Sequence, residues 1–183
     1  MFSGSVVDKF TVSEVGEVVL RYLEMSDASD LQELMNALIE EGAEFRYQEK
    51  MSFEEQIDWT AEALKDVEKG ERVQLVVDVD DRVMGSLSVV RGEEAKSHLG
   101  EVGILLREGI RGRGIGEYSL RRLIEEARQR LKLDILVLKV HETNEVAINL
   151  YNKLGFEKAG SIRDGVLQDG RYKDLIYMQR DLR

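Results

Sequence analysis

Three glycines stand at alternate positions, Gly112, Gly114 and Gly116, in the stretch LREGIRGRGIGEYSL, together with Arg111 and Arg113. The stretch follows an apolar run and leads into a segment with helical spacing. Because glycine has no Cβ, several backbone N–H groups can converge there on one ligand, with the positive end of the helix dipole behind them. The pattern predicts a cradle for phosphate groups, although a short glycine cluster also fits a plain turn.

The spacing excludes two common phosphate-binding motifs. A dinucleotide fingerprint needs a third glycine where Glu117 stands. A P-loop needs Gly-Lys followed by Ser or Thr, whereas Gly114 is followed by Ile115. A phosphate ligand of this turn must therefore be bound by another motif.

The elements that position this turn indicate one α/β domain over residues 1–183, with a mostly antiparallel first half and at least one strand, helix, strand crossover. Apolar alternation predicts strands at 17–23, 73–79, 83–90, 101–106, 135–140, 156–162 and 173–178. Helical spacing and caps predict helices at 27–41 and 52–70, after the glycines to about 131, and at 146–154.

Composition narrows the class of protein. The net charge of −10 argues against binding to nucleic acid or to an anionic membrane. The absence of cysteine excludes disulfides, thiolate zinc sites and a cysteine nucleophile, and fits a reducing compartment. The N-terminus has no pattern of a secretion signal, and the apolar runs are far shorter than the roughly 20 residues that span a bilayer. We therefore expect a cytoplasmic protein.

A second motif follows downstream, in VHETNEVAINLYNKLGFEKAG. Taken together, the two motifs resemble the GNAT superfamily of acetyl-coenzyme A-dependent N-acetyltransferases. Arg111, Gly114 and Gly116 match its Arg/Gln-x-x-Gly-x-Gly/Ala motif. The pattern Asn-x-x-Ala-x-x-Leu-Tyr-x-x-x-Gly-Phe is matched by Asn144, Ala147, Leu150, Tyr151, Gly155 and Phe156. The motifs lie within about residues 100–160, roughly a third of the chain.

The resemblance implies a fold and a cofactor site. The expected fold is a central mixed sheet of about six to seven strands with about four helices, in which strand 101–106 splays from strand 135–140 and leaves a V-shaped slot. Acetyl-coenzyme A (acetyl-CoA) is the implied cosubstrate. Its pantetheine arm would pair with the backbone of Ile104, Leu105 and Leu106. Its diphosphate would lie on the amides of Arg111, Gly112, Arg113, Gly114, Ile115 and Gly116.

The resemblance also assigns roles to three side chains. Tyr151 would protonate the departing thiolate, although it also fits an apolar helical stripe as a core residue. Asn144 fits a helix N-cap and, in the family, also contacts the cofactor. Glu101 would remove the amine proton, or is an exposed residue at a strand end. The two histidines, His98 and His141, have no metal-binding spacing, so no metal is expected.

The predicted function is acetyl transfer from acetyl-CoA to a primary amine by direct attack. The acceptor amine belongs to a small amine, an amino acid or a peptide or protein N-terminus. Two alternatives stay open: a noncatalytic coenzyme A-binding or sensing module, and an acyltransferase with a longer acyl group. Residues 27–69 carry thirteen acids against four bases, with Glu40, Glu41 and Glu44 near a helix connection, so we predict a cationic acceptor. The resemblance also allows a homodimer.

Overall fold

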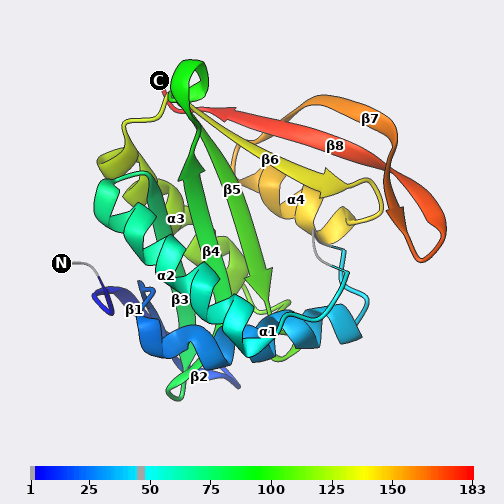
Figure 1. Cartoon of the computed structure of the whole chain (residues 1–183). Coiled ribbons are helices and arrows are strands. Elements are labelled where there is room, and N and C mark those ends of the chain that lie inside the picture. The colour runs from blue at the N-terminus through cyan, green and yellow to red at the C-terminus, as the bar shows by residue number, and fades with distance from the viewer. Residues whose placement is uncertain (1–2, 45–47) are drawn as a thin grey trace.

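The computed structural model describes residues 3–44 and 48–183. In it, the chain folds into one mixed β-sheet with helices on both faces (Figure 1). The strands in these residues are β1 Val6–Val12, β2 Gly16–Tyr22, β3 Arg72–Val79, β4 Arg82–Arg91, β5 Leu99–Leu106, β6 Ile135–His141, β7 Glu157–Gln168 and β8 Arg171–Asp181. The α-helices in the same residues are α1 Ala28–Glu40, α2 Phe53–Lys69, α3 Ile115–Leu131 and α4 Glu145–Lys153.

The order of the strands is β1-β2-β3-β4-β5-β6-β8-β7. All neighbouring pairs in it are antiparallel except β5 and β6, which are parallel. The chain passes from β5 to β6 through α3, as expected for a parallel connection. The α/β expectation with one crossover of this kind is therefore confirmed.

The two faces of the sheet are covered differently. On one face, α1 and α2 pack over β3 and β4 around a small apolar cluster that includes Leu34, Leu38 and Val76. On the other face, α3 and α4 contribute Leu123, Tyr151 and many others to the larger cluster. Figure 1 shows α1 and α2 in front of the strands and α3 behind them. We call these the α1/α2 face and the α3/α4 face.

Local signals set the helix ends where the sequence predicts them. Ser52 and Glu55 form the expected capping box at the start of α2, in which the Glu55 amide donates to the Ser52 hydroxyl at 3.2 Å. Gly70 ends this helix with a left-handed φ of 72°. These two ends confirm the predicted helix 52–70.

The strand count differs from the expectation, because the described residues hold eight strands and not six to seven. The unpredicted strand is β1, at the sheet edge. A bulge between Val6 and Asp8 interrupts its register, so that Val7 and Phe10, both packed on the core, stand three residues apart and not two. The alternation that marks a strand in sequence is lost there. The last two strands are also longer than predicted.

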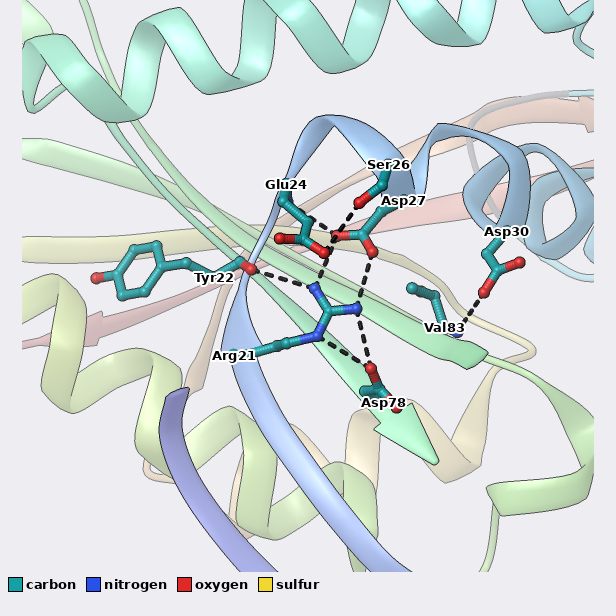
Figure 2. A network of polar contacts seen from close by, with 8 residues as sticks. All are labelled: Arg21, Tyr22, Glu24, Ser26, Asp27, Asp30, Asp78 and Val83. Carbon is teal, nitrogen blue, oxygen red and sulfur yellow. Dashed lines mark hydrogen bonds and ion pairs between the residues drawn. The ribbon is translucent and has the colours of Figure 1, made fainter. Parts of the chain in front are cut away.

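A buried ionic network fixes the start of α1 on the sheet (Figure 2). Arg21 of β2 makes a bidentate pair with Asp27, with nitrogen–oxygen distances of 2.8 and 2.9 Å, and donates through Nε to Asp78 of β3 at 3.0 Å. Asp30 accepts the Val83 amide at 2.8 Å. Breaking a buried pair of this kind typically costs about 3–5 kcal/mol. Two acids of the acidic segment therefore have structural roles.

Candidate active site

A slot opens between β5 and β6 because their pairing ends early. The register pairs are Leu99 with Ile135, Gly100 with Leu136 and Glu101 with Val137. Beyond Glu101, β5 continues to Leu106 with β4 as its partner, and β6 continues to His141 with β8 as its partner. The two strands therefore diverge toward their C-terminal ends, as Figure 1 shows.

The edge of β5 that faces the slot includes the residues expected to meet the pantetheine arm. Ile104, Leu105 and Leu106 pair with β4 on one side and have no strand partner on the other. Ile104 and Leu106 pack toward the larger core, while Leu105 packs toward the smaller cluster. The slot is thus lined on this wall by backbone that can still form hydrogen bonds.

The glycine turn lies at the C-terminal end of β5 and opens α3. Gly112 and Gly114 have φ values of 71° and 79°, and Gly114 is the residue that caps the helix. Six consecutive amides, from 112 to 117, donate to no acceptor among the described residues. A helix start leaves its first amides free, and the two left-handed glycines add further free donors before it. The turn therefore has the donors that an anion cradle needs.

The glycines at 114 and 116 have different reasons for lacking a side chain. A Cβ on Gly114 would meet no atom within 4 Å, so that side of the turn is open. A Cβ on Gly116 would lie 3.0 Å from Leu106 Cδ1 and 3.8 Å from both Ile104 Cδ1 and Leu150 Cδ2. Close packing of α3 on β5 therefore accounts for the glycine at position 116.

Both arginines of the turn are bound to other parts of the chain. Arg111 donates through Nε to the Leu106 carbonyl and through a terminal nitrogen to Glu41, each at 2.7 Å. Arg113 donates to Glu14 at 2.7 Å. Their positive charges lie beside the cradle, while their hydrogen bonds hold the turn in place. Ile115 is fully buried in the core and anchors the first turn of α3.

Tyr151 lies on α4, the helix whose Leu150 approaches Gly116 and β5. Its ring is 7% exposed and packs edge-on against Phe156, with ring centroids 5.9 Å apart. Burial raises the pKa of its hydroxyl to about 12, and this hydroxyl has no hydrogen-bond partner among the described residues. Tyr151 is thus a core residue that also keeps an uncommitted, protonated hydroxyl.

Asn144 is the N-cap of α4, as predicted. Its side-chain oxygen accepts the Ala147 amide at 3.1 Å. This bond fixes the start of the helix that carries Tyr151.

Glu101 is the last paired residue before the slot opens. Its side chain is exposed, and Lys139 Nζ of β6 donates to it at 3.0 Å. It points to the α1/α2 face, because it alternates with Leu105, which packs there. The structure thus brings Glu101 to the apex of the slot.

A polar cluster that sequence reasoning did not identify lies at the far end of the β6 wall. Glu44, after α1, accepts hydrogen bonds from Lys173 Nζ at 2.5 Å and from the Thr143 hydroxyl. His141 ends β6 and is 8% exposed, and its Nδ1 is buried without a partner. Gln168 Nε2 reaches the carbonyls of residues 42 and 43 at 3.4 and 3.3 Å. These contacts join positions 99 to 129 residues apart, so no local pattern indicates them.

Among the residues that the structure describes, no group of three or more histidine, cysteine or acidic side chains is arranged to hold a metal ion. No helix in the described ranges is long and apolar enough to cross a membrane.

Comparisons with known proteins agree with this architecture. The model of the acetyltransferase (GNAT) family matches residues 31–156. The L-amino acid N-acetyltransferase AaaT of Escherichia coli (strain K12) is 34% identical over 108 residues, which are 58% of this chain and 67% of AaaT. Other curated relatives are matched over about half of their length, 47% and 49%.

Solved structures share the fold. The ribosomal-protein-alanine N-acetyltransferase of Brucella melitensis has a TM-score of 0.79 and 28% identity, with 89% of this chain and 99% of that chain covered. The acetyltransferase yncA of Salmonella typhimurium, solved with its cofactor acetyl-CoA, has a TM-score of 0.80 and 22% identity, with 91% and 94% covered. A family match over most of the chain, the shared fold and the divergent β5–β6 pair lead to one conclusion: this protein belongs to the GNAT family of N-acetyltransferases.

Proposed function

We propose that the chain binds acetyl-CoA in the β5–β6 slot and transfers its acetyl group directly to the primary amine of an amino acid, a small amine or a peptide N-terminus. The observation that carries this proposal is the run of six free amides from 112 to 117 beside a strand edge without a partner. Similarity to AaaT and to the Brucella enzyme favours an amino-acid or peptide amine.

The backbone supplies most of the binding. The amides of 112–117 would hold the diphosphate, with Arg111 and Arg113 adding positive charge beside it. The free edge of residues 104–106 would pair with the pantetheine arm and place its amides near the acyl oxygen. One such donor is worth about 3 kcal/mol where its removal has been studied in enzymes. Asn144 contributes by fixing the start of α4.

The side chains would move two protons. Acetyl-CoA supplies a thioester whose acyl carbon a neutral amine can attack. Glu101, at the apex of the slot, would accept the proton from the amine, directly or through water. Tyr151 would give its proton to the departing sulfur, because its burial keeps the hydroxyl protonated until high pH. The chain has no cysteine, so an acyl-cysteine enzyme intermediate cannot form. Direct attack of the amine on the thioester is consistent with this composition.

The nature of the acceptor depends on which charges are free. The acids on which the prediction of a cationic acceptor rests each pair with a base: Glu40 with Lys50 at 2.5 Å, Glu41 with Arg111 at 2.7 Å and Glu44 with Lys173 at 2.5 Å. Pairing weakens the field that would attract a cation. A cationic acceptor stays a prediction, which a comparison of diamines with neutral amines at low and high salt tests.

Assembly and location are also proposals. Strand β7 lies at the sheet edge, and Ile162, Leu167 and Tyr172 of the β7–β8 hairpin are at least half exposed. Such an edge suits a homodimer, which light scattering would reveal by a doubled mass. The lack of cysteine fits the cytoplasm.

A thiol-release assay tests the central proposal. With acetyl-CoA and a panel of amino acids, amines and short peptides, we expect release of free coenzyme A that depends on one acceptor class. Binding of coenzyme A in calorimetry without turnover on any acceptor would favour the sensing module. Faster turnover with propionyl- or butanoyl-CoA than with acetyl-CoA would favour the longer acyl group.

A further inference from the structure

A half-buried ion pair lies at the open end of the slot, on the α1/α2 face. The side chains of Glu44 and Lys173 are 20% and 21% exposed, and Nζ lies 2.5 Å from the carboxylate. Although burial raises the pKa of Glu44, the hydrogen bonds from Lys173 and Thr143 hold it below its ordinary value. Glu44 is therefore a carboxylate held by a cation and a hydroxyl.

The surroundings of this carboxylate include one unused polar atom. His141, the last residue of β6, lies close enough to Glu44 and Lys173 to interact with both charges, and its Nδ1 is buried without a partner. A buried nitrogen without a hydrogen bond is costly, and ligands commonly satisfy such atoms. A buried polar atom of a residue within electrostatic range of the Glu44–Lys173 pair therefore has no hydrogen-bond partner among the described residues.

The backbone before Glu44 is fixed independently of the Glu44 side chain, because the Gly42 and Ala43 amides donate to the carbonyls of Ile39 and Leu38 at 3.0 and 2.9 Å. Gln168 holds the carbonyls of Gly42 and Ala43 through hydrogen bonds of 3.4 and 3.3 Å, longer than the usual 2.9–3.0 Å. The Glu44 side chain contributes two further contacts, with Thr143 and Lys173, and the backbone hydrogen bonds do not depend on them. A competing carboxylate could therefore replace it without disturbing a helix or strand.

We propose that Lys173, Thr143 and His141 form a subsite for a carboxylate of the acceptor, and that Glu44 occupies this subsite when no acceptor is bound. The proposal rests on the proposed acetyl transfer. On binding, the acceptor carboxylate takes the hydrogen bonds of Lys173 and Thr143, and His141 Nδ1 gains a partner. The amine of the same molecule then points along β6 into the slot.

The first experiment compares acceptors that differ at one group. A ladder of ω-amino acids from glycine to aminohexanoate is assayed beside amino alcohols and diamines of equal length. We expect the carboxylate series to have the highest kcat/KM, with a maximum at the length that spans the amine and Lys173. A preference for the diamines, or equal values in all three series, would overturn the subsite.

The second experiment uses matched variants. Lys173→Gln should raise the KM of the best ω-amino acid about tenfold, the loss expected from one well-placed partly buried charge pair, and change that of the amino alcohol less than twofold. Glu44→Gln should lower the KM of the ω-amino acid, because the competing charge is gone. Lys173→Arg keeps the charge and should keep most of the binding.

An exposed ion pair on the same connection provides the control. Lys50 and Glu40 lie 2.5 Å apart with side chains 58% and 62% exposed, so Lys50→Gln, which also removes a lysine from an ion pair, should leave the KM of the ω-amino acid unchanged. If Lys173→Gln raised the KM of the amino alcohol as much as that of the amino acid, the Glu44–Lys173 pair would be structural and the subsite disproved.

A binding measurement separates this proposal from the proposed function. In His98→Asn protein, His141 is the one histidine left in the sequence, so its ring signals in NMR are unambiguous. Aminohexanoate should shift these signals in the presence of coenzyme A, and the shift should disappear in Lys173→Gln. A shift without turnover on any acceptor would refute acetyl transfer and retain the subsite. Turnover of ω-amino acids without a shift of the His141 signals would retain acetyl transfer and disprove the subsite.

Discussion

The two walls of the slot are held by contacts of very different range. On the β5 wall, the glycine turn depends on neighbours: Arg111 returns to the Leu106 carbonyl five residues before it, and Gly114 opens the helix that follows. On the β6 wall, Glu44 meets Thr143 and Lys173 across 99 and 129 residues. The backbone of the first wall is therefore set by local contacts, to which Arg111 and Arg113 add side-chain pairs across 70 and 99 residues. The second wall is assembled from three distant segments.

This difference suggests that the β5 wall serves the cofactor and the β6 wall serves the acceptor. A cofactor with a constant diphosphate suits a rigid backbone cradle, in which donors are fixed by φ angles. An acceptor that varies between family members suits side chains on a connection and a hairpin, which can change without altering the sheet. The comparison predicts that changes on the β5 wall affect coenzyme A binding, whereas changes at Glu44, Thr143 or Lys173 affect the acceptor.

The largest effect on coenzyme A binding is expected from Gly114→Glu. The side chain would enter the open space at the turn with a negative charge, so the Kd for coenzyme A in calorimetry should rise about ten- to a hundredfold, since one charge-assisted hydrogen bond contributes ~1.5–3 kcal/mol. An unchanged Kd would remove the diphosphate from this turn.

Gly114→Ala is the matched control. Because φ at this position is 79°, any side chain introduces strain of about 1 kcal/mol, which lowers Tm by roughly 2–4 °C in a chain of this size. The same loss of Tm should occur in Gly114→Glu, so the difference in Kd between the two variants measures bulk and charge alone.

The next effect concerns the hydroxyl of Tyr151. Tyr151→Phe removes one oxygen from a ring that is 7% exposed, so packing should be kept while kcat falls on the order of a hundredfold, as for loss of a general acid. The Kd of coenzyme A and the KM of the acceptor should change little. If single-turnover rates matched those of the original protein, Tyr151 would be a core residue and no more.

The same variant gives a pH test of stability. Burial raises the pKa of Tyr151 from 10 to about 12, so its contribution to stability is complete below pH 10 and is lost as the pH rises toward 12. The loss should be about 1.4 kcal/mol for each pH unit in that window. Urea unfolding of Tyr151→Phe should show a shallower decline. Tyr22, whose pKa is also raised by burial, contributes equally in both proteins. Parallel declines would show that the hydroxyl is hydrated.

The smallest effect belongs to the β6 wall. Thr143→Val removes one hydroxyl donor to Glu44 and keeps the shape of the side chain. We expect a change of two- to threefold, about 0.5 kcal/mol, in the KM of a carboxylate acceptor and none in the Kd of coenzyme A. A larger effect on coenzyme A than on the acceptor would contradict the division between the walls.

The glycine turn of the β5 wall and two helix starts elsewhere in the chain could be predicted from sequence because their signals are local. The glycine spacing, the capping box at Ser52 and the N-cap Asn144 each act within a few residues, and each lies where it was expected. Glu101 was expected at the start of strand 101–106, and the register adds that it is the last residue of β5 paired with β6. Its role, like those of Tyr151 and the turn amides, stays a prediction.

The β6 wall could not be predicted, because pairing partners are set by the fold and not by spacing. Glu40, Glu41 and Glu44 carry negative charge in the sequence, but which base neutralises each one depends on how α1 lies relative to α3 and the hairpin. Strand β1 could not be predicted because its bulge inserts one extra residue. This residue shifts the apolar alternation that marks the buried face of a strand in the sequence.

The three register pairs between β5 and β6 also have a mechanical consequence. They are the strand pairs that join β1–β5 to β6–β8 within the described residues, so the ladder of the sheet crosses this boundary through three pairs. Beyond these pairs, the facing edges of β5 and β6 carry backbone groups without a strand partner among the described residues. Unpaired strand edges of this kind can form hydrogen bonds with another extended chain. A cofactor arm lying between these two edges would form hydrogen bonds with them and limit their separation. Amide hydrogen exchange at residues 104–106 should then slow when coenzyme A is added. Strand β3, which is paired with β2 and β4 on its two sides, should exchange as before.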